Sequence, residues 1–260
     1  MAELNGSPVS LEDLQTLALT NYGHFTSMRV DDGVIRGLSL HMERLVRDSH
    51  LVFGAELDPE KVLGYVRQAV AHQSGSFNIR ITVFDPALEM GHPGVEAHPQ
   101  VLVTSRPTGA MPPPPLKAKT FSFSRDLAVV KHMGLFGQLH LRREAQLAGY
   151  DDAIFVESDG RVSEGGTWNL GFVDEAGTVV WPDAPVLPGV TMQLLQQAHE
   201  QTTTAPVTLA DLPRMRAAFA TNTSIGVRSI SKIDALEFDS DDPVLGTLRK
   251  AYAGLPDERL

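Results

Sequence analysis

Residues 128–136, AVVKHMGLF, and residues 159–169, DGRVSEGGTWN, decide how this sequence is interpreted. Lys131 directly follows the apolar run LAVV at 127–130, and this run predicts a buried strand. Burial disfavours the charged form of an amine, so such a lysine would be a good nucleophile towards an aldehyde. In the second stretch Glu164 stands between a tight turn and two glycines. Taken singly, both residues are more simply explained as exposed, the lysine reaching solvent and the acid lying in a turn.

Three further motifs contain groups suited to binding a phosphate: HMERL at 41–45, LPGVT at 187–191 and TNTS at 221–224. LPGVT leads into an amphipathic helix whose first amides, at Val190 and Thr191, would have no intrahelical partner. Such a helix start binds phosphate through its amide donors and the helix dipole. An ordinary capped helix is the more common explanation of the same pattern.

The other two motifs offer complementary donors. TNTS follows the apolar run AAFA and supplies small hydroxyl and amide groups, while Arg44 within HMERL supplies a cation for charge-assisted hydrogen bonds. A solvated helix arginine is the simpler alternative for Arg44. Together with the amine of Lys131 and the carboxylate of Glu164, these groups are what is required to hold pyridoxal phosphate (PLP) and use it as an electron sink.

The composition limits the classes of partner. The chain has 260 residues, of which 42% are apolar, an ordinary value for a globular protein with a sizeable core. Its net charge of −10 and pI near 5.3 argue against nucleic acid or an anionic membrane as partner, since both require a basic face. No segment has the character of a signal peptide or a membrane span. We therefore expect a cytoplasmic protein with no nucleic-acid or membrane partner.

Cysteine and metal chemistry are not expected. The sequence contains no cysteine, which excludes disulfides, thiolate metal sites and cysteine nucleophiles. The nine histidines show no metal-ligand spacing, and His132 and His140, eight residues apart, are better explained as structural. The motifs of dinucleotide-binding enzymes, P-loop proteins, zinc proteases and serine hydrolases do not occur.

A proline-rich segment divides the chain. Residues 106–117, RPTGAMPPPPLK, contain five prolines, four of them consecutive, and predict a stiff, extended connector. We expect an α+β fold with an N-terminal α/β domain at 1–106, a linker at 107–117 and a C-terminal domain at 118–260.

Hydrophobic periodicity and capping signals predict the elements of both domains. In the N-terminal domain we expect helices at about 11–19, 39–54 and 59–72, a hairpin formed by 24–30 and 34–38, and strands at 77–84 and 100–105. In the C-terminal domain we expect strands at 120–124, 127–130, 153–158, 169–173 and 178–181, and helices at about 136–148, 190–200 and 243–253.

In these motifs and their order the chain resembles fold-type IV PLP enzymes, also called class IV aminotransferases. That family includes branched-chain and D-amino-acid aminotransferases, R-selective amine transaminases and aminodeoxychorismate lyases. The resemblance extends from NYGHFTSMRV, through HMERL, the lysine, EGGTWN and LPGVT, to TNTSIGVRSISKID, and so covers nearly the whole chain. It implies a small α/β N-terminal domain, a larger β-barrel-like C-terminal PLP-binding domain, and a homodimer.

The resemblance also implies roles for individual residues. Lys131 would form the Schiff base with PLP and, once displaced by substrate, move a proton between Cα and C4′. Glu164 would pair with the pyridinium nitrogen. The phosphate-binding residues would be Arg44, Val190, Thr191, Thr223 and Ser224, and the substrate-pocket residues would be Tyr22, Phe25, Arg80 and Phe136.

Two positions depart from the family pattern. Branched-chain enzymes usually carry a tyrosine five residues after the lysine, near the cofactor's 3′-oxygen, and this chain has Phe136 there. Gly171 stands where an aromatic residue often follows the asparagine Asn169. Both departures argue against a standard branched-chain enzyme. They leave the PLP prediction unchanged, because Lys131 and Glu164 are both present.

We therefore expect a PLP-dependent aminotransferase that moves an amino group between a small amino acid or amine and a 2-oxo acid. One alternative is a C–C lyase similar to aminodeoxychorismate lyase, which uses the same cofactor and lysine but releases pyruvate. A second is a non-catalytic PLP-binding protein. The sequence does not specify the substrate, because Arg29, Arg80 and Arg228 are each able to bind a substrate carboxylate or only to solvate a strand.

Overall fold

The computed structural model describes residues 2–109 and 111–260. Met1 and Ala110, which fall within the predicted N-terminal domain and linker, lie outside the described residues. The predicted domain boundaries stay a prediction. By packing, the chain forms unit 1, made of Met1–Thr108, Val130–Gly134 and Pro256–Leu260, and unit 2, made of Gly109–Val129 and Leu135–Leu255.

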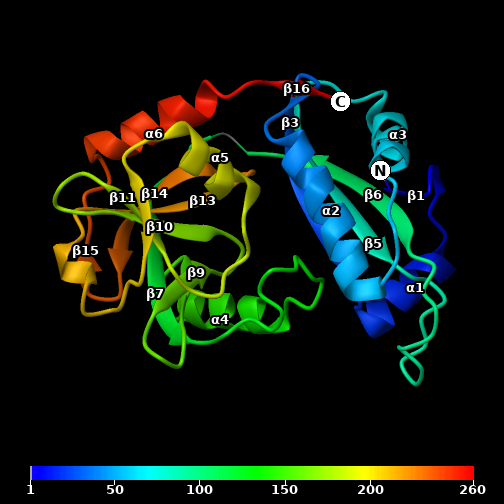
Figure 1. Cartoon of the computed structure of the whole chain (residues 1–260), viewed down its shortest axis with the longest axis horizontal. Helices are drawn as coiled ribbons and strands as arrows, with labels where there is room; N and C mark the ends of the chain where they lie inside the picture. Colours follow the sequence, from blue (N-terminus) through cyan, green and yellow to red (C-terminus); the bar gives the residue numbers. More distant parts are fainter. Residues whose placement is uncertain (1, 110) are drawn as a thin grey trace. The chain divides into compact units, whose positions relative to one another are not determined.

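Unit 1 is built on a seven-stranded antiparallel sheet (Figure 1). The central strands β3 and β5 pair along eight residues, from His24↔Val83 to Asp31↔Ser76, and the predicted hairpin of β3 with β4 is confirmed. In spatial order the strands are β16 (Glu258–Arg259), β4 (Val34–Ile35), β3 (His24–Asp31), β5 (Ser76–Phe84), β6 (Gln100–Pro107), β1 (Ala2–Leu4) and β2 (Ser7–Pro8).

The helices of unit 1 end where the local signals predict. Ser10 and Asp13 form a capping box at the start of the first helix, and Asp58 caps the third ahead of its first-turn proline. Gly54 ends the second helix with a φ of 62°, a conformation that costs glycine little. The three helices are α1 (Leu11–Thr20), α2 (Leu38–Phe53) and α3 (Pro59–Val70).

The alternation of side chains along the strands decides which face each helix covers. Ile79 and Val103 share one core cluster with Leu45 of α2 and Val66 of α3. Leu102, which points to the opposite face of the sheet, packs with residues of α1. α2 and α3 therefore cover one face, and α1 covers part of the other (Figure 1).

Unit 2 is built on a closed six-stranded barrel. The ring runs β10–β13–β14–β7–β8–β9 and closes back onto β10 through a pair between Glu164 of β9 and Asn169 of β10. β7 pairs in parallel with both β8 and β14, while the other barrel pairs are antiparallel. The barrel strands are β7 (Leu116–Ser122), β8 (Asp152–Val156), β9 (Val162–Gly165), β10 (Asn169–Val173), β13 (Ala217–Asn222) and β14 (Gly226–Ile233).

Further elements surround the barrel. A core cluster with members from all six strands fills its interior, and a second cluster joins the outer faces of β10 and β13 to α5 and α6 (Figure 1). The predicted C-terminal helices are confirmed to within two residues. The surrounding elements are β11 (Val179–Pro182), β12 (Thr202–Ala205), β15 (Leu236–Glu237), α4 (Phe136–Leu147), α5 (Val190–Ala198), α6 (Pro243–Ala253) and a short 3₁₀ helix (Leu212–Arg214).

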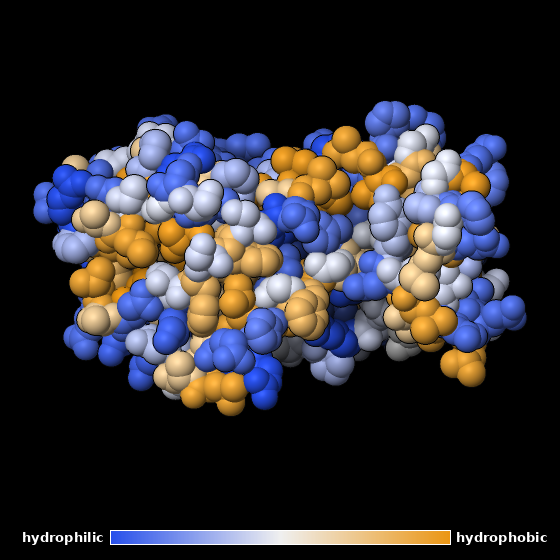
Figure 2. Space-filling model, turned by 90° about the horizontal axis from the view of Figure 1, so that it is seen from below, coloured by the Kyte–Doolittle hydropathy of each residue, from blue (hydrophilic) through white to orange (hydrophobic). Residues whose placement is uncertain are grey.

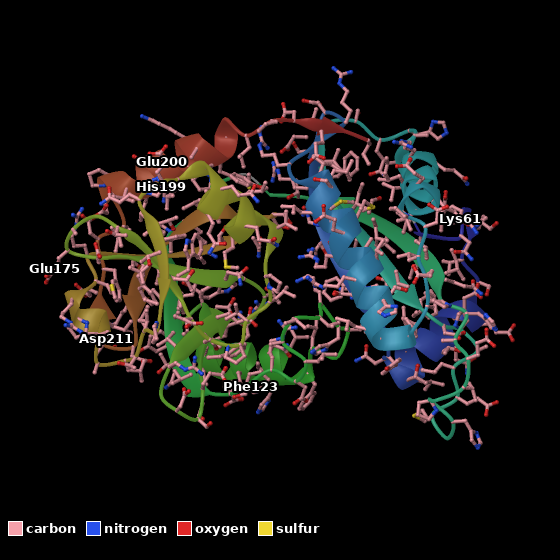
Figure 3. All side chains as sticks on the ribbon, in the orientation of Figure 1. Lys61, Phe123, Glu175, His199, Glu200 and Asp211 are labelled. Atoms are coloured by element: carbon pink, nitrogen blue, oxygen red, sulfur yellow. The ribbon has the colours of Figure 1, made fainter. Side chains whose placement is uncertain are left out.

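The predicted strand at 127–130 is wrong. These residues form turns and a bend, and Leu127 has a φ of 46°. Phe123, labelled in Figure 3, starts the loop; it packs 4.8 Å from the ring of Phe155 and lies where a side chain at Gly137 would have to fit. The apolar run therefore reflects partial burial, with Val130 fully buried and Leu127 56% exposed, and not strand pairing.

Gly171, the second departure from the family pattern, has a packing reason. It pairs with Phe219 on the neighbouring strand β13, and a β-carbon at position 171 would lie 2.3 Å from the Phe219 ring. The aromatic side chain of β13 thus covers the glycine of β10, and no larger residue fits at position 171 without moving Phe219.

The surface mixes hydrophilic and hydrophobic residues over the face seen in Figure 2. None of the helices within the described residues is both long enough and apolar enough to cross a membrane. Likewise, the described part of the chain holds no cluster of three or more His, Asp or Glu side chains arranged for a metal ion.

Candidate active site

The backbone around Lys131 lies against the start of β3 and is hydrogen-bonded to it. Its carbonyl accepts a hydrogen bond from the amide of Phe25 at 2.9 Å, and its own amide donates to Asp48 of α2 at 3.0 Å. The next residue, His132, forms an isolated antiparallel bridge with His24. The lysine is therefore held by contacts with β3 and α2, not by a strand of its own.

The side chain of Lys131 lies near two other predicted residues. Its ammonium is 4.9 Å from the centre of the Phe25 ring, and the guanidinium carbon of Arg80 is 3.6 Å from the same centre. Phe25 and Arg80 stand on the neighbouring strands β3 and β5, on the sheet face away from α2. Burial lowers the pKa of Arg80, and the nearby Arg106 lowers it further.

Arg44 is buried on α2, with 6% of its surface exposed. Its Nη2 donates to the hydroxyl of Thr26 and lies 3.1 Å from Nδ1 of His41. Burial lowers the pKa of Arg44 to about 10; Asp48 opposes this change and Arg47 adds to it. Its Nε has no hydrogen-bond partner among the described residues, so one donor of a buried cation remains available.

Two buried histidines, His24 and His41, lie near Arg44. Burial lowers the pKa of His24 to about 3 and that of His41 well below its usual range, and Arg44 acts in the same direction on both. Both rings are therefore neutral at pH 7. Thr26, which accepts from Arg44, is 2.7 Å from Nδ1 of His41, so this nitrogen is the acceptor and the ring proton is on Nε2.

Glu164 lies on β9 of unit 2 and is 4% exposed, which rules out the exposed turn acid considered from the sequence. Its Oε1 accepts a hydrogen bond from Arg125 Nη1 at 3.0 Å, and its Oε2 accepts the amide of Leu187 at 3.2 Å. Both carboxylate oxygens of Glu164 are therefore held in place by donors of unit 2.

Leu187 ties the LPGVT motif to the barrel. Its amide reaches Glu164, and its carbonyl accepts the side-chain amide of Asn169 at 2.7 Å. The following Gly189 lies so close that a β-carbon there would be 1.9 Å from Oδ1 of Asn169. The start of α5 is thus fixed against the point where β9 meets β10.

The first turn of α5 is buried and carries uncapped donors. Gly189 at the N-cap offers no side chain, and Val190 and Thr191 are 2% and 1% exposed. Within the described residues the hydroxyl of Thr191 has no partner, and the hydroxyl of Thr221 on the adjacent β13 has none either. Unpaired buried hydroxyls cost free energy, so a ligand that satisfies them is favoured.

The TNTS motif spans the end of β13 and the turn that follows it. Oδ1 of Asn222 accepts the amides of Ser224 and Ile225 at 2.9 and 3.1 Å, and its side-chain amide donates to the carbonyl of Thr167 at 3.1 Å. Asn222 thereby fixes the turn that presents Thr223 and Ser224.

Two predicted pocket residues have other surroundings. Tyr22 is 44% exposed; its hydroxyl donates to the carbonyl of Val52 at 3.0 Å and its ring meets Phe53 edge-on. Phe136 is 82% exposed in the first turn of α4, stacked on His140 at 5.8 Å. Their place in a substrate pocket stays a prediction.

The structure separates the three candidate arginines by their partners. Arg29 pairs through Nε with both oxygens of Asp31 at 3.0 Å, and Arg228 donates from Nε to the carbonyl of Pro114 at 2.6 Å. Arg80 instead stacks on Phe25, near the ammonium of Lys131. Of the three, Arg80 has the surroundings best suited to a substrate carboxylate.

The structure brings together only some of the predicted residues within each unit. In unit 1, Lys131, Phe25 and Arg80 lie together and Arg44 stands on α2; in unit 2, Glu164 is tied through Leu187 to the helix start of Val190 and Thr191, and Thr223 and Ser224 lie in the turn after β13. Tyr22 in unit 1 and Phe136 in unit 2 stand apart from them. The residues fit PLP: among the described residues, the unpartnered buried donors of Arg44 in unit 1 and of Thr191 and Thr221 in unit 2 each suit a phosphate, the carboxylate of Glu164 suits a pyridinium N–H, and Lys131 provides the amine.

Sequence reasoning missed two polar residues of the site. Asp48 was detectable, because it follows Arg44 by four residues and so shares its helix face. Arg125, in a loop, carries no local signal, and its importance comes from a long-range contact with Glu164. Thr221 opens the predicted TNTS motif, but its place at the end of β13, paired with Asn169, comes only from the fold.

Solved structures with the same fold include several aminotransferases. A branched-chain aminotransferase from Thermoproteus uzoniensis with norvaline is 21% identical, with 97% of this chain and 93% of that chain covered and a TM-score of 0.84. The Escherichia coli branched-chain amino acid aminotransferase is 20% identical, with coverages of 98% and 93% and a TM-score of 0.84. A hypothetical aminotransferase from Mycobacterium tuberculosis in its PLP-bound form is 18% identical, with coverages of 97% and 97% and a TM-score of 0.82. No curated protein matches this sequence.

The α/β unit and the closed barrel match the fold of PLP-dependent enzymes of fold-type IV. More particularly, residues 23–233 match the family model of amino-transferase class IV, and the chain belongs to that family. It is a PLP-dependent aminotransferase that acts on an amino acid and a 2-oxo acid. The predicted fold class, cofactor and enzyme class are confirmed, and no observation favours the lyase alternative.

The Arg125–Glu164 pair is expected to be important for stability. Both side chains are less than one-tenth exposed, so Arg125→Met leaves a buried carboxylate uncompensated and should lower the free energy of unfolding by about 3–5 kcal/mol. The exposed pair of Arg143 with Glu144 provides the control, because Arg143→Met should cost less than about 1 kcal/mol. Urea unfolding measures both. Adding Glu164→Gln to Arg125→Met should recover most of the loss; equal losses in both arginine variants would contradict the prediction.

His24 should make stability depend on pH. Its folded pKa of about 3 lies below the unfolded value of about 6.5, so the unfolded chain binds the proton preferentially. The contribution of neutral His24 to the free energy of unfolding is complete above pH 6.5. It decreases as pH falls towards 3, with a slope of up to about 1.4 kcal/mol per pH unit. We expect His24→Phe, which keeps a ring beside Phe53, to flatten the dependence of unfolding free energy on pH between 6.5 and 4. Parallel curves for the two proteins would exclude this role.

Proposed function

We propose that this aminotransferase moves an amino group between a small amino acid or amine and a 2-oxo acid, with Lys131 as the catalytic residue. The observation that carries the proposal is the tie through Leu187. One residue joins the buried carboxylate of Glu164 to the uncapped start of α5. An acid for a ring nitrogen and donors for a phosphate therefore belong to one rigid part of the barrel.

The cofactor contacts follow from the chemistry of these groups. In this proposal Arg44, Val190, Thr191, Thr223 and Ser224 would hold the phosphate of PLP, by a guanidinium, helix-start amides and turn donors. Glu164 would accept a hydrogen bond from the pyridinium N–H and so keep the ring nitrogen protonated. Bound PLP supplies an electron sink that makes the Cα–H bond of an amino substrate acidic.

The amine of Lys131 has two tasks in this proposal. It would hold the aldehyde carbon of the cofactor before substrate arrives. Once released, its Nζ would take the proton from the substrate Cα and return it at C4′ of the cofactor. The ring of Phe25 and the guanidinium of Arg80 lie near this amine, which supports the assignment of both to the substrate pocket. Arg80 would bind the substrate carboxylate.

Covalent attachment of PLP tests the central assignment. Borohydride treatment of PLP-loaded protein should fix the cofactor to the peptide that contains Lys131, as seen by mass spectrometry. Lys131→Ala should abolish this label and lower aminotransfer by at least about 10²–10⁴-fold, the usual value of a positioned acid–base group. Lys61→Ala, on the exposed surface of α3 (Figure 3), is the control and should retain both. A label on any other lysine would overturn the assignment.

We also propose a homodimer and a cytoplasmic location. Unit 2 exposes five large apolar side chains in its loop before Lys131 and in α4: Leu127, Val129, Phe136, Leu139 and Leu147. Exposed apolar patches commonly mark protein–protein contacts. Sedimentation equilibrium should therefore give twice the 28.2 kDa mass of the chain, and a monomer at micromolar concentration would reject the dimer.

A further inference from the structure

Asp48 is a fully buried carboxylate whose two oxygens have different partners. Oδ2 accepts the backbone amide of Lys131 at 3.0 Å. Oδ1 accepts two hydrogen bonds from Arg47, from Nε at 3.0 Å and from Nη2 at 2.7 Å. Asp48 is 0% exposed, whereas the side chain of its partner Arg47 is 40% exposed.

The ion pair with Arg47 alone does not explain this burial. Removing a carboxylate from water costs several kcal/mol unless its hydrogen bonds are satisfied inside the protein. A half-exposed arginine can pair with an exposed acid at no such cost. The bond to the amide of Lys131, in contrast, is possible only from a buried position between α2 and the lysine segment. The burial of Asp48 therefore follows from its contact with residue 131.

The segment around Lys131 needs such a contact. It belongs to no strand and follows a loop in which Leu127 adopts a φ of 46°. The carbonyl of Lys131 is fixed from β3 by the amide of Phe25, and its amide is fixed from α2 by Asp48. Both backbone polar groups of the lysine are thus held, one by each of two rigid elements.

The same helix also carries Arg44, one turn before Asp48. Residues four apart lie on the same face of a helix. α2 therefore presents a buried cation and, one turn later, the carboxylate that fixes the backbone of Lys131. A shift of the lysine segment relative to α2 would change its place relative to Arg44.

We propose that Asp48 is a positioning residue: its carboxylate fixes the backbone of Lys131 relative to α2, and so places the lysine amine for reaction. The catalytic consequence rests on the function proposed for Lys131, but the structural consequence does not. A purely stabilising ion pair with Arg47 is the competing explanation, and the two differ in which variants release the lysine segment.

Three full-length variants separate these explanations. Asp48→Asn retains an oxygen that can accept the Lys131 amide but loses the charge. Asp48→Ala removes the acceptor. Arg47→Met removes the ion pair and keeps the acceptor. The first readout is hydrogen exchange of the Lys131 amide in the PLP-free protein, resolved by fragmentation mass spectrometry, which does not depend on catalysis.

Asp48→Ala should raise the exchange rate of the Lys131 amide by about 10- to 30-fold, the factor that a lost hydrogen bond provides. Asp48→Asn and Arg47→Met should stay within about threefold of wild type. A rise in Arg47→Met as large as that in Asp48→Ala, or no rise in Asp48→Ala, would overturn the proposal. If Asp48→Ala does not fold, the other two decide: protection in both supports positioning, and a tenfold loss in either overturns it.

The second readout is the division between kcat and KM in PLP-loaded protein. Misplacing a reacting group by about 1 Å costs roughly 10²-fold in rate, so Asp48→Ala should lower kcat by that factor and change KM for the amino donor by less than about threefold. If wild-type protein carries PLP on another lysine, the proposed function fails while the exchange result stands. If PLP is on Lys131 and exchange is unchanged in Asp48→Ala, only the positioning role fails.

Discussion

The barrel of unit 2 closes at one pair of residues, Glu164 of β9 and Asn169 of β10, and the candidate site depends on that closure. This pair connects the two ends of the ring of strands. The side chains of the same two residues hold the amide and carbonyl of Leu187, and through it the start of α5. The interaction that completes the fold of the barrel is thus also the one that orients a carboxylate and a helix N-terminus together, which relates the fold directly to the chemistry.

Close packing at this point explains the glycines of both motifs. A β-carbon at Gly165 would lie 2.1 Å from the ring of Trp168, and one at Gly189 would lie 1.9 Å from Asn169 Oδ1. In the sequence these glycines look like ordinary turn residues beside Glu164 and Val190. In the structure they are positions where the side chains of Trp168 and Asn169 leave no room for a β-carbon. A site built on such contacts has little freedom to relax, which is what a preorganised set of donors requires.

Local signals predicted the helices well and the lysine segment poorly. Ser10, Asp58 and Gly54 mark helix ends through bonds within a few residues, so the sequence contains the whole interaction. The run before Lys131 has strand-like residues, yet no neighbouring strand pairs with it. The backbone of Lys131 itself is fixed by Phe25 and Asp48, which are more than eighty residues away in the chain. The same limit applied to Arg125, whose contact with Glu164 only the fold reveals, and to the pairing of Thr221 with Asn169.

The charges near Lys131 show how an acidic protein can build a site for an anion. The whole chain carries −10, but Arg44, Arg80 and Lys131 lie within unit 1 near two buried histidines. With a pKa of about 10, Arg44 keeps its proton at pH 7, whereas the depressed pKa of His24 keeps that ring neutral. The neutral histidine rings therefore pack near Arg44, and His41 contacts its guanidinium, without adding electrostatic repulsion. Asp48 opposes the fall in the pKa of Arg44, and its single negative charge lies beside the positive charges of Arg44 and Arg47, so positive charge is in excess there. That excess suits a phosphate and a substrate carboxylate, so the local arrangement of charge, not the net charge, is what favours the ligands of an aminotransferase.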